Sequence, residues 1–281
     1  MDTKTKLELQ KIAVKIRKGV IEGTGHAKSG HPGGSLSIAD IVAYLYFHEM
    51  NVDPANPKWP DRDRFVLSKG HTAPALYAAL ALKGFFPWEH IATLRQPDSI
   101  LQGHPSMKYT PGVDMSTGSL GQGISTAVGM ALGAKLQGKA FRVYSPLGDG
   151  EIEEGQVWEA AMLAGNRKLD NLVAIVDWNN LQIDGSLDEV NSPCPIDKKF
   201  EAFGWNVITI DGHDFDQIDE AFTAAKACKG KPTCIIAKTI KGKGVSFMED
   251  KCEWHGSAPN AEQYEQAMAE LDAALAGLEA E

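Results

Sequence analysis

The stretch FRVYSPLGDG, residues 141–150, decides the fold together with LVAIVDWNN, residues 172–180. The apolar runs 141–147 and 172–177 are typical of buried strands, and the segment 153–169 between them is typical of a helix. A strand, a helix and a strand in this order form one parallel βαβ unit. Because parallel strands end at the same edge of a sheet, we expect Asp149 and Asn179 to lie side by side there.

Both strand ends offer oxygen ligands. Asp149 supplies a carboxylate, Asn179 an amide oxygen and Leu181 a backbone carbonyl. Mg²⁺, or another divalent cation such as Ca²⁺ or Mn²⁺, prefers such ligands, and Mg²⁺ leaves its other positions to phosphate and water. Gly150 has no side chain where a phosphate would approach the backbone. Gly-Asp-Gly is also common turn chemistry, but the spacing of the two strand ends favours a magnesium diphosphate site.

This pair of half-sites matches the signature of thiamine-diphosphate enzymes, and the chain from about Ile16 to about Ala258 resembles the amino-terminal part of transketolase. Five further segments carry the resemblance in the family's order, which argues against coincidence. They are Ser29–Gly34, Leu67–His71, Gln102–Pro105, Ser116–Gly123 and Trp254–Gly256.

The resemblance implies roles for individual residues. Asp149, Asn179 and the carbonyl of Leu181 would hold the metal. The residues that match cofactor contacts are His71, Gly118, Ser119, Leu120, Gly148, Asp149, Gly150, Glu151, Asn179 and His255. The residues that match catalytic positions are His31, His71, His104 and His255. Imidazole titrates near neutrality, which suits proton transfer to sugar oxygens. The histidines without a match, expected to be ordinary surface residues, are His26, His48, His90 and His213.

In the family, the glutamate that faces the aminopyrimidine of thiamine diphosphate belongs to a second α/β domain. The resemblance therefore implies one subunit of a split transketolase. A carboxy-terminal partner subunit would carry the pyrimidine-binding domain, most naturally in an α₂β₂ assembly. The expected contact surface is the small-residue segment 121–137 with the helix around 156–163. Glu154 and Glu159 either match a region that faces the partner protomer in transketolase or are exposed helix carboxylates that only add solubility.

The implied reaction transfers a two-carbon ketol unit from a ketose phosphate to an aldose phosphate. Three alternatives stay open within cofactor chemistry: a subunit similar to deoxyxylulose-phosphate synthase, a subunit of a 2-oxo acid dehydrogenase, or a catalytically silent subunit that only binds the cofactor. The loop 239–244 resembles the corresponding loop of deoxyxylulose-phosphate synthase. Its lysines, Lys241 and Lys243, either serve anionic substrates or are solvated. A Rossmann-like domain with fortuitous motifs is the remaining alternative.

Composition argues against several classes of protein. The formal net charge of −9 and the lack of a basic stripe argue against nucleic acid as a partner. No apolar run is long enough to cross a membrane, and the amino terminus lacks the apolar core of a secretory signal. The four cysteines have neither CxxC spacing nor the density of a disulfide scaffold. We therefore expect a cytoplasmic protein with reduced thiols.

The elements alternate as in an α/β fold, so we predict one domain over residues 1–281 with a doubly wound, mainly parallel sheet flanked by helices. Ser37 is expected to cap the second helix. The predicted strands are 141–147, 172–177, 205–211 and 233–238. The predicted helices are 7–22, 37–50, 73–82, 87–94, 121–137, 153–169, 196–203, 215–229 and 260–278.

Overall fold

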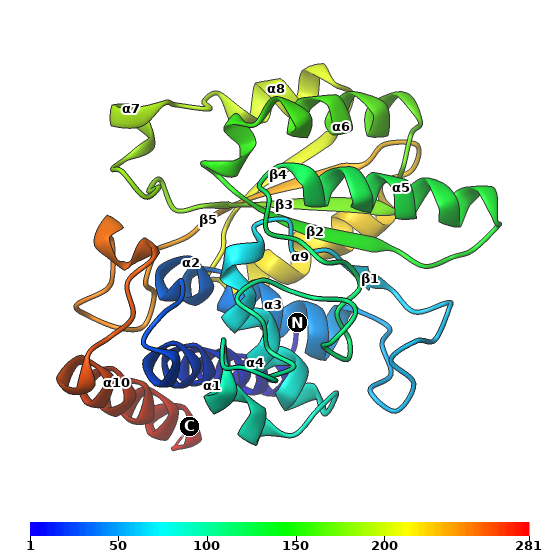
Figure 1. The fold of residues 1–281 in the computed structure, drawn as a ribbon. Helices are drawn as coiled ribbons and strands as arrows, with labels where there is room; N and C mark the ends of the chain where they lie inside the picture. The colour runs from blue at the N-terminus through cyan, green and yellow to red at the C-terminus, as the bar shows by residue number, and fades with distance from the viewer. Residues whose placement is uncertain (281) are drawn as a thin grey trace.

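The computed structural model describes residues 1–280, and residue 281 of the predicted domain lies outside this range. Its five strands form one parallel sheet in the order β1-β2-β3-β5-β4, and they point to the same edge (Figure 1). The central β3 is buried on both faces, which explains its continuous apolar run. The strands are β1 (Arg64–Phe65), β2 (Val143–Gly148), β3 (Leu172–Trp178), β4 (Asn206–Asp211) and β5 (Thr233–Lys238).

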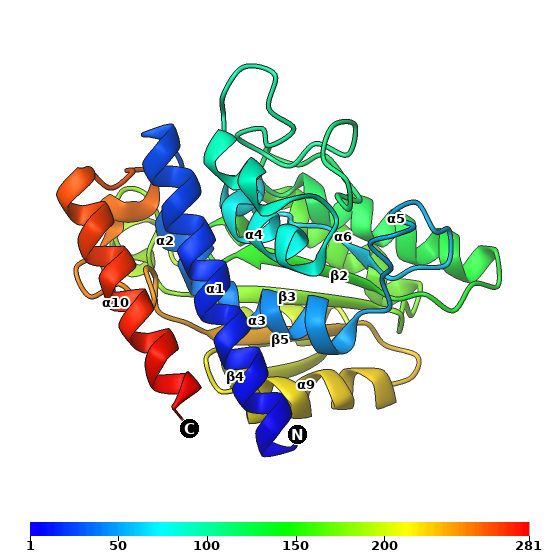
Figure 2. The ribbon, with the colours of Figure 1, turned by 90° about the horizontal axis from the view of Figure 1, so that it is seen from below.

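Helices cover both faces of the sheet, so the predicted doubly wound α/β fold is confirmed. One face packs against α5 (Gln122–Leu136), α6 (Gly155–Asn166) and α8 (Ile196–Ala202). The other packs against α1 (Thr3–Ala27), α3 (Ala39–Tyr44), α4 (Ala73–Lys83) and α9 (Phe215–Ala227). Figure 2 shows α10 (Ala261–Glu279) beside α1 at the outer edge of that layer. The short remaining helices are α2 (Pro32–Ser37), a π-helix (Leu45–Glu49), 3₁₀ helices (Gly70–Thr72, Trp88–Thr93, Glu151–Glu153, Cys252–His255) and α7 (Leu187–Val190).

Most predicted elements are confirmed with shifted ends, and β5 matches its predicted bounds. The segment 37–50 is the main correction. Ser37 ends α2 instead of capping a helix, because its hydroxyl is buried and donates to the carboxylate of Asp177, 2.6 Å away. The predicted helix 87–94 is a 3₁₀ helix. The two-residue β1 was not predicted, since so short a strand has no readable alternation.

The glycines of α5 serve two surfaces. A Cβ on Gly123 would lie 2.5 Å from the Cα of Ser68, so this glycine allows the helix to approach the loop after β1. A Cβ on Gly129 or Gly133 would meet no atom within 4 Å. The amino-terminal part of α5 is therefore closely packed, whereas these two glycines face outward.

Among residues 1–280, no helix combines the length and the apolar character that crossing a membrane requires. The expected cytoplasmic location stays a prediction.

Candidate active site at the carboxyl edge of the sheet

The predicted metal residues lie at the carboxyl ends of the neighbouring strands β2 and β3. The Oδ2 atom of Asp149 accepts a 2.6 Å hydrogen bond from the backbone N–H of Asn180, and Oδ1 accepts one of 2.9 Å from Gly150. The two strand ends are thus joined through one carboxylate. The prediction that Asp149 and Asn179 lie side by side is confirmed.

The chemistry of these oxygens fits a divalent cation. Asp149 is 3% exposed, and burial, followed by the charge of Asp177, raises its pKa to about 7. A bound dication would stabilise the ionised form that burial disfavours. Within residues 1–280, no cluster of three or more His, Cys, Asp or Glu side chains is arranged to hold a metal. A metal here would therefore depend on the amide oxygen of Asn179 and the carbonyl of Leu181 as well.

A cavity opens beside these oxygens. The predicted site residues that line it are His71, Leu120, Gly148, Asp149, Gly150, Glu151, Asn179, Leu181 and His255. Lys69, which was given no role of its own, and Lys241, for which contact with anionic substrates was one of two interpretations, line it too. Gly118, Ser119, His31 and His104 are not part of its lining, although His31 lies next to it.

Three of the four predicted catalytic histidines form a cluster. The ring centroids of His31 and His71 are 5.2 Å apart, those of His31 and His255 are 5.6 Å apart, and those of His71 and His255 are 5.1 Å apart. Burial, followed by the charges of Arg95, His104 and Lys241, lowers the pKa of His31 to about 4. Burial and the charge of Lys241 lower the pKa of His255 to about 3. At neutral pH both rings are therefore uncharged.

His104 lies outside this cluster. Its side chain is exposed, and a Cβ on Gly118 would lie 3.1 Å from its ring. Gly118 has a φ of 154°, so both the positive φ and the close ring favour glycine. Two of the predicted segments, 102–105 and 116–123, thus meet at this contact.

Glu151 lines the cavity, but its carboxylate is bound within the protein. Oε1 accepts hydrogen bonds from Ser68 Oγ at 2.5 Å and from the backbone N–H of Gly121 at 3.0 Å, and Oε2 accepts one from Gly148 at 2.9 Å. These bonds connect the ends of β2 and α5 with the loop after β1. Glu151 therefore shapes the cavity wall, and its predicted contact with the cofactor stays a prediction.

A buried ion pair between Lys69 and Asp177 lies beneath the cavity. The side chains are 2% and 0% exposed. Burial alone would raise the pKa of Asp177, but Lys69 and the hydroxyls of Ser37 and Thr239 hold it below its usual value. Lys69 also donates to the carbonyl of Gly34 at 3.1 Å. The segment 67–71 was recognised from its sequence, whereas its buried partner at the end of β3 could not be read from spacing.

Lys241 and Lys243 differ, although the sequence left them with the same two interpretations. Lys241 is 2% exposed, and its ammonium donates to the carbonyl of Leu181 at 2.8 Å and to Nδ1 of His255 at 3.0 Å. Burial lowers its pKa to about 8. Lys243 lies at the surface, 3.4 Å from a carboxylate oxygen of Glu249. Solvation is thus the wrong interpretation for Lys241.

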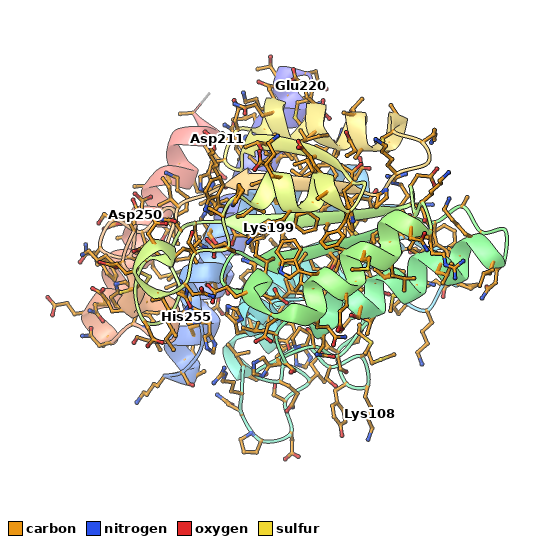
Figure 3. All side chains as sticks on the ribbon, turned by 90° about the horizontal axis from the view of Figure 1, so that it is seen from above. Lys108, Lys199, Asp211, Glu220, Asp250 and His255 are labelled. Carbon is orange, nitrogen blue, oxygen red and sulfur yellow. The ribbon has the colours of Figure 1, made fainter. Side chains whose placement is uncertain are left out.

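The segment after β5 closes this edge of the sheet. Figure 3 labels Asp250 and His255, which lie along it. Its backbone is tied to α2, because Gly242 donates to the carbonyl of Gly33 at 3.0 Å. His255 is held in a 3₁₀ turn, Cys252–His255, that faces the histidine cluster.

The family described as transketolase, thiamine diphosphate binding domain, matches residues 9–274. The chain belongs to this family. Its resemblance to transketolase is therefore confirmed over nearly the whole chain, and the fold is that of the family's thiamine-diphosphate-binding domain.

Two of the most similar relatives of this transketolase domain are separate subunits. This chain is 52% identical over 266 residues to the 6-deoxy-6-sulfo-D-fructose transketolase subunit of Clostridium sp. (strain MSTE9). The alignment covers 95% of this chain and 97% of the relative. The chain is 45% identical over 275 residues to an apulose-4-phosphate transketolase subunit of Phocaeicola vulgatus, with coverage of 98% and 97%.

Solved structures give the same family. Transketolase from Campylobacter jejuni superimposes with a TM-score of 0.90 at 35% sequence identity, covering 99% of this chain. The present transketolase domain spans 46% of that longer chain.

Proposed function

We propose that the chain is the diphosphate-binding subunit of a split transketolase, and that residues 1–281 act as one domain. The observation that carries the proposal is the 97% coverage of two relatives that are each named as a transketolase subunit. The clustered oxygens, lysines and histidines at the carboxyl edge of the sheet support it. A carboxy-terminal partner subunit, in an α₂β₂ assembly, completes the proposed enzyme.

The proposed reaction transfers a two-carbon ketol unit from a ketose phosphate to an aldose phosphate. When bound, thiamine diphosphate supplies the carbon nucleophile that carries this unit between sugars. Asp149, Asn179 and the Leu181 carbonyl hold Mg²⁺. His71, His255 and Lys241 border the diphosphate, with Lys241 adding positive charge beside the metal oxygens.

The neutral histidines transfer and share protons at the sugar. His31 and His255 are uncharged at neutral pH, so each ring has one N–H and one acceptor nitrogen. In His255 the acceptor Nδ1 is bound by the Lys241 ammonium, so the N–H that can face a substrate oxygen is at Nε2. They stabilise and reprotonate substrate oxygens, and His104 donates a hydrogen bond to the transferred fragment. Gly118, Ser119 and Leu120 contact the aminopyrimidine region.

The partner contact is proposed on α5 and α6. Leu136 of α5 and Met162 of α6 are 80% and 57% exposed, and a side chain on Gly129 or Gly133 of α5 would meet open space. Exposed apolar side chains next to glycines fit a closely packed interface between subunits. Trp158, part of the surface expected from the sequence, is half-buried against Phe200, with ring centroids 5.2 Å apart.

The test is an assay of the chain mixed with thiamine diphosphate, Mg²⁺ and its co-expressed partner. Ketol transfer from a ketose phosphate to an aldose phosphate is the expected result. Pyruvate decarboxylation, or condensation of pyruvate with glyceraldehyde 3-phosphate, would instead support the 2-oxo acid or deoxyxylulose-phosphate alternatives. Cofactor binding with none of these reactions would support a silent role. The donors tested include a 6-sulfonated ketose, because the relative that is 52% identical is named for one.

We expect His31→Ala and His104→Ala to lower turnover by roughly 10² each, as for lost general acid–base groups. Thiamine diphosphate binding should change little, since neither side chain lines the metal cavity. Steady-state kinetics of the reconstituted enzyme and calorimetry of the chain give the two readouts. His90→Ala, a histidine packed against Phe86 away from the cluster, is the control. Full activity in both site variants would contradict the assignment.

A further inference from the structure

His213, expected to be an ordinary surface histidine, belongs to a buried network. Asp40 of α3 lies between two cationic or donor groups from other parts of the fold. Arg17 of α1 binds both of its carboxylate oxygens, and Nδ1 of His213 lies 2.7 Å from Oδ2. The Arg17, Asp40 and His213 side chains are 8%, 7% and 15% exposed. This network joins α1, α3 and the turn after β4.

The other nitrogen of His213 fixes its tautomer. The backbone N–H of Ile240 donates to Nε2 over 2.9 Å. A peptide N–H can only donate, so Nε2 carries no proton and Nδ1 donates its hydrogen to Asp40. His213 therefore receives a hydrogen bond from the residue immediately before Lys241 while it is itself anchored to a buried carboxylate.

The rest of the loop is restrained around the same lysine. Asp250 donates its backbone N–H to the carbonyl of Lys241 at 2.9 Å, and Gly242 donates to Gly33 at 3.0 Å. Gly242 has a φ of 79° and lies against the backbone of Met248, which leaves no room for a side chain. Two side-chain bonds hold the ends of the loop, since Thr239 donates to the carboxylate of Asp177 and the N–H of Gly244 donates to Oε1 of Glu249 at 2.9 Å. The side chain that binds the backbone N–H next to Lys241 is that of His213.

We propose that His213 is a positioning residue: anchored by Asp40 and Arg17, it fixes the backbone at Ile240 and so keeps the Lys241 ammonium at the Leu181 carbonyl and His255. Neither His213 nor Asp40 lines the cavity. They act through the loop 239–244. The proposal rests on the cofactor site proposed above, because Lys241 borders the diphosphate there.

The test compares three variants of the full chain. His213→Phe removes the donor and the acceptor. His213→Gln keeps one hydrogen-bond donor and one hydrogen-bond acceptor, in the side-chain amide. Tyr44→Phe is the matched control, since it removes a 2.9 Å hydrogen bond to Asp219 between α3 and α9, in the same layer, without touching the loop. Hydrogen–deuterium exchange of peptides covering 239–244, thermal unfolding, and calorimetry with Mg²⁺ and thiamine diphosphate are measured for each.

His213→Phe is expected to increase exchange in the loop and to weaken thiamine diphosphate binding by about tenfold, the lower range for residues that orient a ligand-holding group. His213→Gln should recover most of both effects. Tyr44→Phe should lower the unfolding temperature without either effect. Unchanged loop exchange in a folded His213→Phe chain, or equal weakening by Tyr44→Phe, would overturn the proposal.

Two further comparisons distinguish a failure of this proposal from a failure of the proposed cofactor site. If wild type binds thiamine diphosphate and His213→Phe binds it equally well, only the positioning role fails. If wild type and Asp149→Ala bind it alike, the cofactor site fails, and loop exchange still decides whether His213 holds the segment. If His213→Phe does not fold, ¹⁵N NMR of wild type decides: a proton on Nε2 of His213 would overturn the proposal.

Discussion

The purified chain is expected to show no ketol transfer by itself and to gain it when the carboxy-terminal subunit is added. The family's catalytic glutamate belongs to a second domain, whereas the groups at the carboxyl edge of this sheet are the ones proposed to hold metal and diphosphate. Each tenfold in rate corresponds to about 1.4 kcal/mol of barrier, so losing the group that activates the cofactor removes activity from the measurable range.

Size-exclusion chromatography with light scattering, combined with a ketol-transfer assay, measures this dependence with and without the co-expressed partner. Leu136→Lys and Met162→Lys provide a finer readout, because both side chains are exposed on the proposed contact surface. They should weaken assembly while leaving cofactor binding to the chain unchanged. Robust turnover by the chain alone would refute the split-enzyme proposal.

Asp149→Ala is expected to weaken thiamine diphosphate binding in the presence of Mg²⁺ by at least about 100-fold, the upper range for groups that support a metal site. Asp149 is the only anionic side chain among the proposed metal ligands. Calorimetry of the variant gives the affinity. Asp184→Ala removes an equal charge from an exposed position in the loop after β3 and serves as the control. A folded Asp149→Ala chain with unchanged affinity would contradict the metal site.

Neutralising the same carboxylate should stabilise the cofactor-free chain at alkaline pH. The pKa of Asp149 is raised from 3.8 to about 7, so the folded state binds a proton more tightly than the unfolded state. The stability that this proton gives the folded state is complete below about pH 4 and is lost as the pH rises through 7, a change on the order of 4 kcal/mol. We therefore expect Asp149→Asn to unfold at a higher temperature than wild type at pH 8, with a smaller difference at pH 5.

The sequence predicts those parts of the site that follow from local order. Asp149 and Asn179 come directly after apolar strands, and parallel pairing alone brings such residues together. The histidine loops were recognised through their resemblance to the family. Asp177 and His213 gave no such signal, and the pairing of Lys69 with Asp177 could not be read from the recognised segment 67–71, because the partners of each come from distant elements.

The errors have physical causes too. Ser37 has the composition of a helix cap, but the buried carboxylate of Asp177 takes its hydroxyl instead. There, tertiary hydrogen bonding overrides a local preference, which no window of sequence reports. The three donors around the Glu151 carboxylate also come from separate parts of the chain, so the sequence could not show them, and the cofactor contact of Glu151 stays a prediction.

The histidine cluster also constrains the order in which the molecule is made. His31 comes from the beginning of the chain and His255 from near its end, and the bond between Gly242 and Gly33 joins the same two regions. Contacts of such long sequence separation are slow to form, because the intervening chain must first be ordered. On the ribosome, the βαβ core emerges before residue 255 does. The histidine cluster can therefore form only after most of its scaffold has been synthesised, and a fragment that ends before residue 255 lacks it.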